Sequence, residues 1–377
     1  MNELNDTITE RRRLTRNSIY RYLFFSDAAH SKQEIATDLS LSLPTVHQNL
    51  TELFKAGLVR RCGTQQSTGG RRAMCITIAE NAFFAVGISV TQTEIHFLAA
   101  NLRMEEIVYK KIKQTFDCRD ENIGKMLSDE LENFLSENGL NRKKLLGIGV
   151  TLPAVIDAAR EKIVFAPTMD LKDVSISRYT QYLKYPTYVS NDATSGGYAE
   201  WFTNSAENCM AYLFLENGVG GAAFLGGTPY EGLNGRSGEF GHMCIEPDGL
   251  KCRCGKRGCL EAYCSTSRIS NDLGITLDTF FEELENKNAE YEKLWEDVLR
   301  HLAVGINNIH VALDCDVVIG GMLTQYMKPY MSELKRMATE LNTFEDNADY
   351  IKLCRYPKRA STLGVALHFI EEFINSI

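Results

Sequence analysis

The sequence is organised around one stretch, Gly238-Glu239-Phe240-Gly241-His242, which continues after nine residues as Cys252-Arg253-Cys254-Gly255-Lys256-Arg257-Gly258-Cys259-Leu260-Glu261. Its three cysteines follow a C-x-C-x4-C spacing, and the histidine lies ten positions before the first of them. Three thiolates and one imidazole suit a closed tetrahedral Zn²⁺ site. The glycines of the stretch allow the tight turns with positive φ that wrapping around an ion requires. We therefore predict a structural zinc site formed by His242, Cys252, Cys254 and Cys259.

Two carboxylates, Glu239 and Glu261, flank the predicted metal ligands. A structural ion would hold them and His242 in one pocket, where carboxylate oxygens can accept hydrogen bonds from a polyol. The alternative is a zinc knuckle that only fastens a loop. The stretch thus predicts a metal site and offers a sugar site as the function of its flanking residues.

The pattern Gly-Glu-x-Gly-His followed by Cys-x-Cys-Gly-x-x-Gly-Cys-x-Glu resembles the signature of the ROK family, named for repressors, open reading frames and kinases. The resemblance covers roughly residues 15 to 375. It implies an α/β body with the actin-like (ribonuclease H-like) two-lobed ATPase fold. It also implies zinc bound by the four ligands above and sugar contacts from Glu239, His242 and Glu261.

Length and composition indicate a soluble chain of several domains. The 377 residues suggest two or three domains, and no run of about 18 apolar residues is present that could cross a membrane. The N-terminus lacks the basic and apolar regions of a signal peptide. Eleven cysteines without an export signal indicate thiols and metal ligands rather than a disulfide framework, so we expect a cytoplasmic protein.

Charge is distributed unevenly along the chain. Between Arg11 and Cys75 there are eleven Lys and Arg residues and four Asp and Glu residues, which leaves +7. The rest of the chain holds 30 basic and 45 acidic residues, or −15, and the total is −8. A basic head on an acidic body indicates that the head alone meets a polyanion.

The basic head has the pattern of a helix-turn-helix. Apolar residues recur at helical spacing from Thr15 onward, Ser31 and Glu34 form a capping-box pattern for a second helix, and Ser42 caps a third helix with Pro44 in its first turn. The third helix would enter the major groove. The side chains expected to face outward from it and reach DNA are Ser42, Thr45, Gln48 and Asn49. The alternative is a three-helix packing module without a DNA role.

A strand starting near Val59 and a return strand over Cys75-Ile76-Thr77-Ile78 predict a β-wing. Its arginines could lie along a phosphate backbone or in a minor groove, and they are Arg60, Arg61, Arg71 and Arg72. The alternative is a flexible basic loop. A wing with a Gly-Arg pair resembles those of winged helices fused to ROK-family repressors.

The body opens with strands predicted over 83–90, 94–100, 107–111 and 146–150, with a helix near 123–138. ATP-using members of the family carry Asp-x-Gly-Gly-Thr at the first hairpin, where this chain has Ser89-Val90-Thr91-Gln92-Thr93. Ser89 replaces the carboxylate that organises metal and phosphates, which argues against kinase activity. Gly218-Val219-Gly220-Gly221 resembles the second phosphate loop, although tight hairpins use the same residues.

Asn191 and Asp192 end an apolar strand. By resemblance Asp192 occupies the general-base position of the family, vestigial here, and Asn191 a sugar-contacting position; an Asn-Asp turn or helix cap is the alternative. A further strand is predicted over 316–321, and a closing helix over 361–373.

We therefore expect three domains: residues 1–80 as a winged helix-turn-helix, 81–195 as lobe 1 and 196–377 as lobe 2 with the zinc loop, the closing helix either staying in lobe 2 or returning to lobe 1. The expected function is a sugar-responsive transcriptional regulator of carbohydrate-utilisation genes, with repression favoured. Its expected partners are operator DNA and a sugar or phosphosugar, and two half-sites would require a homodimer or a dimer of dimers. The alternatives are an active sugar kinase with a DNA-binding head, and an interaction protein whose zinc loop docks a partner.

Overall fold

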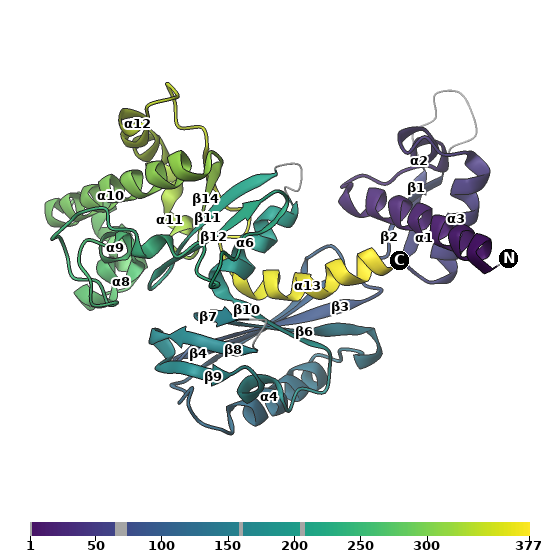
Figure 1. The fold of residues 1–377 in the computed structure, drawn as a ribbon, viewed down its shortest axis with the longest axis horizontal. Coiled ribbons are helices and arrows are strands. Elements are labelled where there is room, and N and C mark those ends of the chain that lie inside the picture. The colour runs from purple at the N-terminus through teal and green to yellow at the C-terminus, as the bar shows by residue number, and fades with distance from the viewer. Residues whose placement is uncertain (1, 65–73, 158–160, 204–207) are drawn as a thin grey trace.

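The computed structural model describes residues 2–64, 74–157, 161–203 and 208–377 of the chain. Figure 1 shows a small head at one side of a two-lobed body, with the last helix between them. The predicted Arg71 and Arg72 of the wing lie outside the described residues. Within the described part of the chain, no helix is both long enough and apolar enough to span a bilayer.

The head contains three helices and a two-stranded hairpin, and its elements are α1 (Asn2–Phe25), α2 (Lys32–Asp38), α3 (Leu43–Lys55), β1 (Val59–Thr64) and β2 (Met74–Ile78). The predicted capping box is confirmed, because Ser31 Oγ accepts from the amide of Glu34 while Glu34 Oε2 accepts from the amide of Ser31. The predicted cap of α3 is confirmed as well, with Ser42 Oγ accepting from the amide of Thr45. These caps fix where α2 and α3 begin, and hence the turn between them.

Lobe 1 is built on a five-stranded sheet whose strands, from edge to edge, are β10 (Thr187–Asn191), β6 (Leu145–Leu152), β3 (Phe84–Val90), β4 (Glu94–Asn101) and β5 (Glu106–Lys113). The pairs β10–β6 and β6–β3 are parallel, and β3–β4 and β4–β5 are antiparallel. One face of this sheet packs on α4 (Ile123–Glu137). The remaining elements of lobe 1 are the small sheet β7 (Val155–Asp157), β8 (Lys162–Ala166) and β9 (Leu171–Ser175), the helix α5 (Ser177–Thr180) and the short helices η1 (Arg142–Lys144) and η3 (Pro167–Met169).

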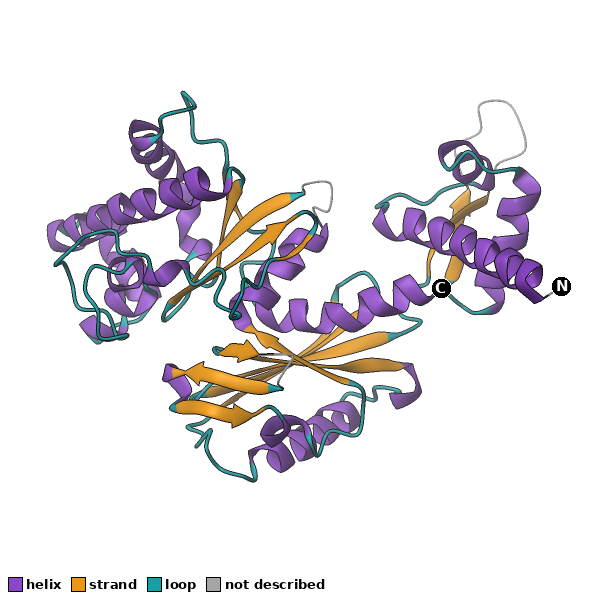
Figure 2. Ribbon diagram, in the orientation of Figure 1, coloured by secondary structure: helices purple, strands orange, loops and turns teal. Residues whose placement is uncertain are grey.

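Lobe 2 is built on a second five-stranded sheet, whose order is β13 (Thr228–Pro229), β12 (Val219–Leu225), β11 (Cys209–Leu215), β14 (Asp316–Gly320) and β15 (Ile351–Leu353). Its outer face is covered by helices, which Figure 2 shows in purple beside the orange strands. They are α7 (Leu260–Cys264), α8 (Thr266–Ile269), η5 (Asn271–Leu273), α9 (Leu277–Glu285), α10 (Ala289–Leu313), α11 (Thr324–Met327), η6 (Lys328–Tyr330) and α12 (Met331–Leu341). The predicted glycine-rich loop over 218–221 is wrong in part. Only Gly218 precedes the strand, because Gly220 and Gly221 pair with β11 inside β12.

Two helices lie back to back between the sheets, α6 (Asp192–Thr203) against lobe 2 and α13 (Ala360–Ser376) against lobe 1. They approach closely, because a Cβ at Gly364 would lie 1.7 Å from the Ser195 carbonyl oxygen. The strands under α13 carry glycines for the same reason: a Cβ at Gly87 would lie 1.8 Å from the Thr362 oxygen, and one at Gly149 would lie 2.3 Å from the Val365 oxygen. Glycine is therefore required at these points of closest approach between α13 and the sheet.

The head and lobe 1 share one continuous hydrophobic core. Buried residues of α1 and α3 join buried residues of β4 and of α13 in a single cluster that includes Ile19, Leu50, Leu98, Phe369 and Ile370. Burial of apolar surface stabilises this arrangement by about 25 cal/mol per Å². The head is therefore packed on the body and not merely linked to it.

Candidate functional site

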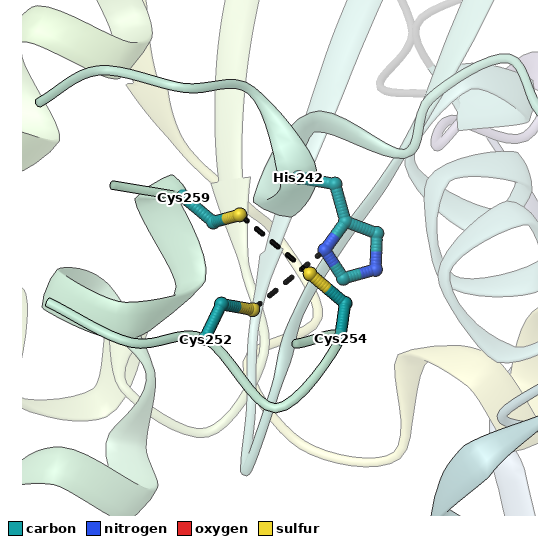
Figure 3. A group of neighbouring side chains, drawn as sticks. All are labelled: His242, Cys252, Cys254 and Cys259. Carbon is teal, nitrogen blue, oxygen red and sulfur yellow. Dashed lines mark hydrogen bonds between the residues drawn. The ribbon is translucent and has the colours of Figure 1, made fainter. Parts of the chain in front are cut away.

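The predicted ligands His242, Cys252, Cys254 and Cys259 lie together in lobe 2, with their ligand atoms all within 4.8 Å of one another. Figure 3 shows the three sulfurs and His242 Nδ1 pointing toward one point. Cys252 Sγ lies 3.9 Å from His242 Nδ1, and Cys254 Sγ lies 3.8 Å from Cys259 Sγ. Sulfurs about 2.3 Å from a tetrahedral Zn²⁺ are about 3.8 Å apart, so this spacing fits zinc. The group is thus able to hold a metal ion.

Local backbone geometry brings these ligands together. His242 ends the short helix η4 (Phe240–His242), and Cys259 caps the start of α7. The amide of Cys252 donates to the Lys256 carbonyl at 2.8 Å, which closes the turn that carries Cys254. Gly258 has a φ of 77°, and a Cβ there would lie 1.9 Å from the Glu246 oxygen. Only glycine fits that position, as the sequence pattern indicates.

Aromatic and polar contacts connect the loop that carries the metal ligands, residues 242–259 (the metal loop), to α10. Tyr263 Oη accepts from the amide of Leu250 at 2.7 Å, and its ring stacks on His301 with centroids 3.9 Å apart. His301 is 3% exposed, and its Nε2 lies 3.0 Å from Glu246 Oε2. The contacts at Glu246 and Leu250 therefore hold the loop in place independently of any ion.

Glu261 connects the metal group to the first hairpin of lobe 2. Its Oε1 accepts from Cys252 Sγ at 3.4 Å, and its Oε2 accepts from the amide of Val219 at 3.1 Å. Gly218 leaves room for this carboxylate, since a Cβ there would lie 2.8 Å from Oε2. Glu239 lies on the other side of the histidine, with its Oε2 3.9 Å from His242 Nε2. The structure thus brings Glu239, His242 and Glu261 to one place.

Asp192 starts α6 and faces the same region. Its Oδ1 accepts from the amide of Ala193 at 2.8 Å. Burial raises the pKa of Asp192 to about 7, and the negative charge of Glu239 adds to the rise. Asn191 is a helix cap: its Oδ1 accepts from the amide of Thr194 at 3.0 Å while its Nδ2 donates to the Ala154 carbonyl at 2.9 Å. Asn191 therefore keeps only its second amide hydrogen and one lone pair for a ligand.

Glu216 is a carboxylate of this region that the sequence patterns did not reveal. It follows β11 directly, and its Oε1 accepts from the amide of Met322 at 2.8 Å. Burial raises the pKa of Glu216 to about 8, and the charges of Asp192 and Glu94 contribute. The sequence signal for Glu216 is a carboxylate at a strand end beside a glycine-rich turn. Glu216 and Asp192 are thus two buried carboxyl groups whose protonated forms are favoured by burial.

The first hairpin of lobe 1 contains Ser89 opposite His96. Thr91 closes its turn: Oγ1 donates to the Glu94 carbonyl and accepts from the amide of Glu94, both at 3.0 Å. Side chains therefore occupy the positions where the kinase motif has glycines.

The predicted DNA-contacting residues of the head differ in exposure and in their hydrogen bonds. Gln48 and Arg61 are exposed, whereas Ser42 and Thr45 share a 2.8 Å hydroxyl contact within the cap of α3. The outward placement of Asn49 is wrong: it is 7% exposed, and its Nδ2 donates to the Thr45 carbonyl at 2.8 Å. Asn49 follows Val46 by three positions, so it lies on the inner stripe of α3.

The wing arginines differ in their contacts. Arg60 Nε donates to Glu80 Oε2 at 2.9 Å, so its charge is already paired. The Arg61 guanidinium lies over the Phe54 ring at 5.4 Å and stays accessible. Of the two arginines, Arg61 is therefore the one whose charge is not paired with Glu80.

Comparison with known proteins gives a consistent result. Residues 85–372 match the model of the ROK family. The chain is 30% identical over 246 residues to the xylose repressor of Bacillus subtilis strain 168, a match that covers 64% of each protein. It is 23% identical over 376 residues to the DNA-binding transcriptional dual regulator NagC of Escherichia coli K12, covering 91% of this chain and 92% of NagC.

Among solved structures, a ROK family transcriptional regulator described as a homolog of the E. coli Mlc protein superposes with a TM-score of 0.73. The two chains are 19% identical, and the superposition covers 97% of each. This likeness confirms the expected fold, a two-lobed actin-like body preceded by a winged helix-turn-helix.

Proposed function

Because the chain belongs to the ROK family, we propose that it is a sugar-responsive DNA-binding regulator, with repression as its mode, of carbohydrate-utilisation genes. The observation that carries this proposal is the shared core of the head and lobe 1, which joins a helix-turn-helix to a body that holds the candidate metal group. The curated relatives compared above are named a xylose repressor and a transcriptional dual regulator. Such a protein would act in the cytoplasm, and two half-sites on DNA would require a homodimer.

In the head, α3 would enter the major groove with Gln48 reaching base edges. Arg61 would contact phosphate from the wing, together with Arg71 and Arg72. Ser42 and Thr45 share one hydrogen bond, which leaves one of their two hydroxyl hydrogens for a DNA contact. Arg60 contributes less because Glu80 neutralises it.

In lobe 2, zinc would be held by His242, Cys252, Cys254 and Cys259. A bound ion would supply rigidity: it fixes the orientation of the imidazole and of the loop that carries Glu261. With Nδ1 toward the sulfurs, His242 Nε2 stays free to face a ligand beside Glu239. The metal thus orders the pocket and takes no part in a reaction.

The sugar would be bound by Glu239, His242 and Glu261 from lobe 2, with Asp192 and Asn191 opposite. Carboxylates accept from ring hydroxyls, and protonated Asp192 can also donate. A pKa of about 7 makes both forms of Asp192 available near neutral pH. A neutral sugar or a phosphosugar suits these donors and acceptors.

We further propose that the protein transfers no phosphoryl group. Kinases hold Mg²⁺ and neutralise charge at the phosphates. Here Ser89 stands at the position of the carboxylate that organises metal and phosphates, so that ligand is missing. Asp192 is then a ligand-binding residue and not a general base.

The test is operator binding titrated with D-xylose, D-glucose, N-acetylglucosamine and their phosphates, using a duplex selected by the parent protein from a random library. Glu239→Gln should shift the sugar response to about ten- to a hundredfold higher concentration, because losing a partner in a buried contact costs about 1–3 kcal/mol. Glu282→Gln, an exposed carboxylate of α9, is the matched control. A parent that binds DNA but ignores every sugar would contradict the proposal, and an unshifted Glu239→Gln response would place the effector elsewhere.

A further inference from the structure

One arginine of lobe 1 reaches into the head. Arg103 lies in the turn between β4 and β5. Its Nη1 donates to the carbonyls of Phe24 at 2.5 Å and Ser26 at 2.9 Å, and its Nη2 donates to the Leu23 carbonyl and to Thr77 Oγ1, both at 3.1 Å. A single guanidinium therefore bonds the end of α1 and the second strand of the wing at once.

The backbone beneath Arg103 is fixed. Asn101 is 4% exposed, and its Oδ1 accepts from the amides of Arg103 at 2.8 Å and Glu105 at 3.0 Å. The amide of Leu102 donates to the Glu80 carbonyl at 2.9 Å, which ties the same turn to the linker 79–83. Arg103 is thus presented from a rigid platform and not from a mobile loop.

The carbonyls that receive Arg103 are those left without a partner at the C-terminal end of α1. A cation at this end of a helix is also favoured by the helix dipole. Burial lowers the pKa of Arg103, and Asp27 is the first of the nearby acidic groups that oppose the change. The contact is therefore specific to a planar, multidentate cation, which lysine cannot replace in full.

The C-terminal end of α13 forms a second contact with α1. Asn17 Nδ2 donates to the Ile374 carbonyl, Arg16 Nη2 donates to the Ile377 carbonyl at 3.3 Å, and Arg21 Nη1 donates to Asn375 Oδ1 at 2.7 Å. The middle of α1 is thus held by α13 while its end is held by Arg103. Two separated contacts fix an orientation, which one contact cannot do.

The other end of α13 lies in the centre of the body. There it packs against α6, whose first residue is Asp192. The two helices are in backbone contact at Gly364 and Ser195, so α6 cannot tilt without moving α13. A ligand that changes the position of α6 would therefore also move α13 and change its contacts with α1.

We propose that Arg103 orients the DNA-binding head on lobe 1, and that the response of operator affinity to sugar passes through this contact and α13. The second part rests on the proposed function. Arg103 is a positioning residue, because its hydrogen bonds go to the head itself. A ligand changes DNA affinity only through states that differ in head orientation, and the Arg103 contact is what distinguishes them.

The test compares Arg103→Ala with Arg142→Ala, which removes the same charge from an arginine of lobe 1 whose side chain bonds to Glu132 and Ser136 of α4. Three quantities are measured: operator affinity with and without the sugar that the parent answers, sugar affinity by thermal shift, and cleavage at Glu80 by a glutamate-specific protease. For Arg103→Ala we expect unchanged sugar affinity, faster cleavage in the loosened linker, and a sugar response of operator affinity reduced at least about fivefold, the low end of ordinary coupling. Arg142→Ala should behave as the parent.

Arg103→Lys keeps the charge and should fall between the parent and Arg103→Ala in both cleavage and sugar response, so it serves also if Arg103→Ala does not fold. The proposal is overturned if the sugar response survives unchanged in the variants, or if cleavage at Glu80 is as slow as in the parent. Because cleavage requires neither sugar nor DNA, it decides the orienting role even if the parent ignores every sugar, a result that would count against the proposed function alone.

Discussion

The two sheets of the body have the same strand order but differ at the ends of their hairpins. In each lobe, the first three strands form an antiparallel meander, and two later strands extend it in parallel from the first strand. In lobe 1 the first hairpin is closed by the Thr91 side chain, whereas in lobe 2 it ends at Gly218, which makes room for Glu261. The framework is shared, and the ligand chemistry belongs to lobe 2.

The second hairpins differ as well. In lobe 2 it is a two-residue turn, Gly226-Gly227, with both φ values positive, as a tight hairpin requires. In lobe 1 the turn is longer and presents Arg103 to the head. The two lobes share one topology but differ in what their hairpins hold: the candidate metal group lies in lobe 2, and the contact with the head is made by lobe 1.

The largest expected effect is a loss of stability in lobe 2 that leaves lobe 1 unchanged. Cys254→Ser should remove the zinc, because three ligands remain, and metal binding in such sites is worth about 10 kcal/mol of folding free energy or more. We expect about one Zn²⁺ per chain in the parent and none in the variant. Hydrogen exchange should accelerate in the metal loop and α7 while the sheet of lobe 1 stays protected. A variant without metal that exchanges like the parent would show that the His301 contacts alone hold the loop.

A second comparison concerns how each sheet meets its central helix. In lobe 1 the glycine at this contact lies on strand β6, so Gly149→Ala would press a Cβ onto the rigid Val365 carbonyl. In lobe 2 the glycine lies on α6, where a Cβ at Gly197 would meet the Phe224 ring at 2.9 Å and the Tyr212 Cβ at 3.0 Å, contacts less close than that at Gly149. A ring can shift, and alanine favours a helix by about 1 kcal/mol over glycine. We expect Gly149→Ala to lower the unfolding free energy by about 3 kcal/mol, and Gly197→Ala by about 1 kcal/mol or less. Equal losses in denaturant titrations would contradict this asymmetry.

The smallest expected effect is on pH dependence. Burial raises the pKa of Glu216 to about 8, so the parent loses stability as the pH rises from about 4.5 to 8, where the folded state holds its proton and the unfolded state does not. Glu216→Gln should therefore gain stability relative to the parent across this range. The gain should reach about 1 kcal/mol and level off above pH 8.

Glu94 of lobe 1 should show the opposite sign. Burial opposes its ionisation, but the hydrogen bonds from Lys111 and His96 outweigh this and lower the pKa of Glu94. Its stabilising contribution is present above the ordinary carboxyl pKa and is lost as the pH falls. Glu94→Gln should thus destabilise at pH 7 and approach the parent below pH 4. Thermal unfolding of both variants from pH 4 to 9 measures the difference, and parallel curves would refute it.

The sequence allowed the metal group and the element order to be predicted, because both are local patterns. Four ligands lie within 18 residues, and Gly258 marks the turn between them. Ser31 and Glu34 likewise specify a cap that spans four residues. Such features depend on neighbours along the chain, where spacing translates directly into geometry.

Features that depend on distant partners could not be predicted. Arg103 is an ordinary polar turn residue until Leu23 and Thr77 come to lie beside it. Glu216 gains its raised pKa from burial that only the assembled cleft supplies. Asn49 is polar, but its position on the inner stripe of α3 buries it. Residue type alone does not specify which contacts the tertiary fold will add.

The position of α13 has a consequence for synthesis. The strands of lobe 1 end at Asn191, but the helix that covers one face of its sheet starts only at Ala360. At about 5–20 residues per second, the ribosome needs roughly ten to thirty seconds to make the intervening chain. During that interval Gly87 and Gly149 line an open apolar groove, and the docking surface for α1 is incomplete. A nascent head can therefore fold early, but it acquires its orientation only when the last helix has left the exit tunnel.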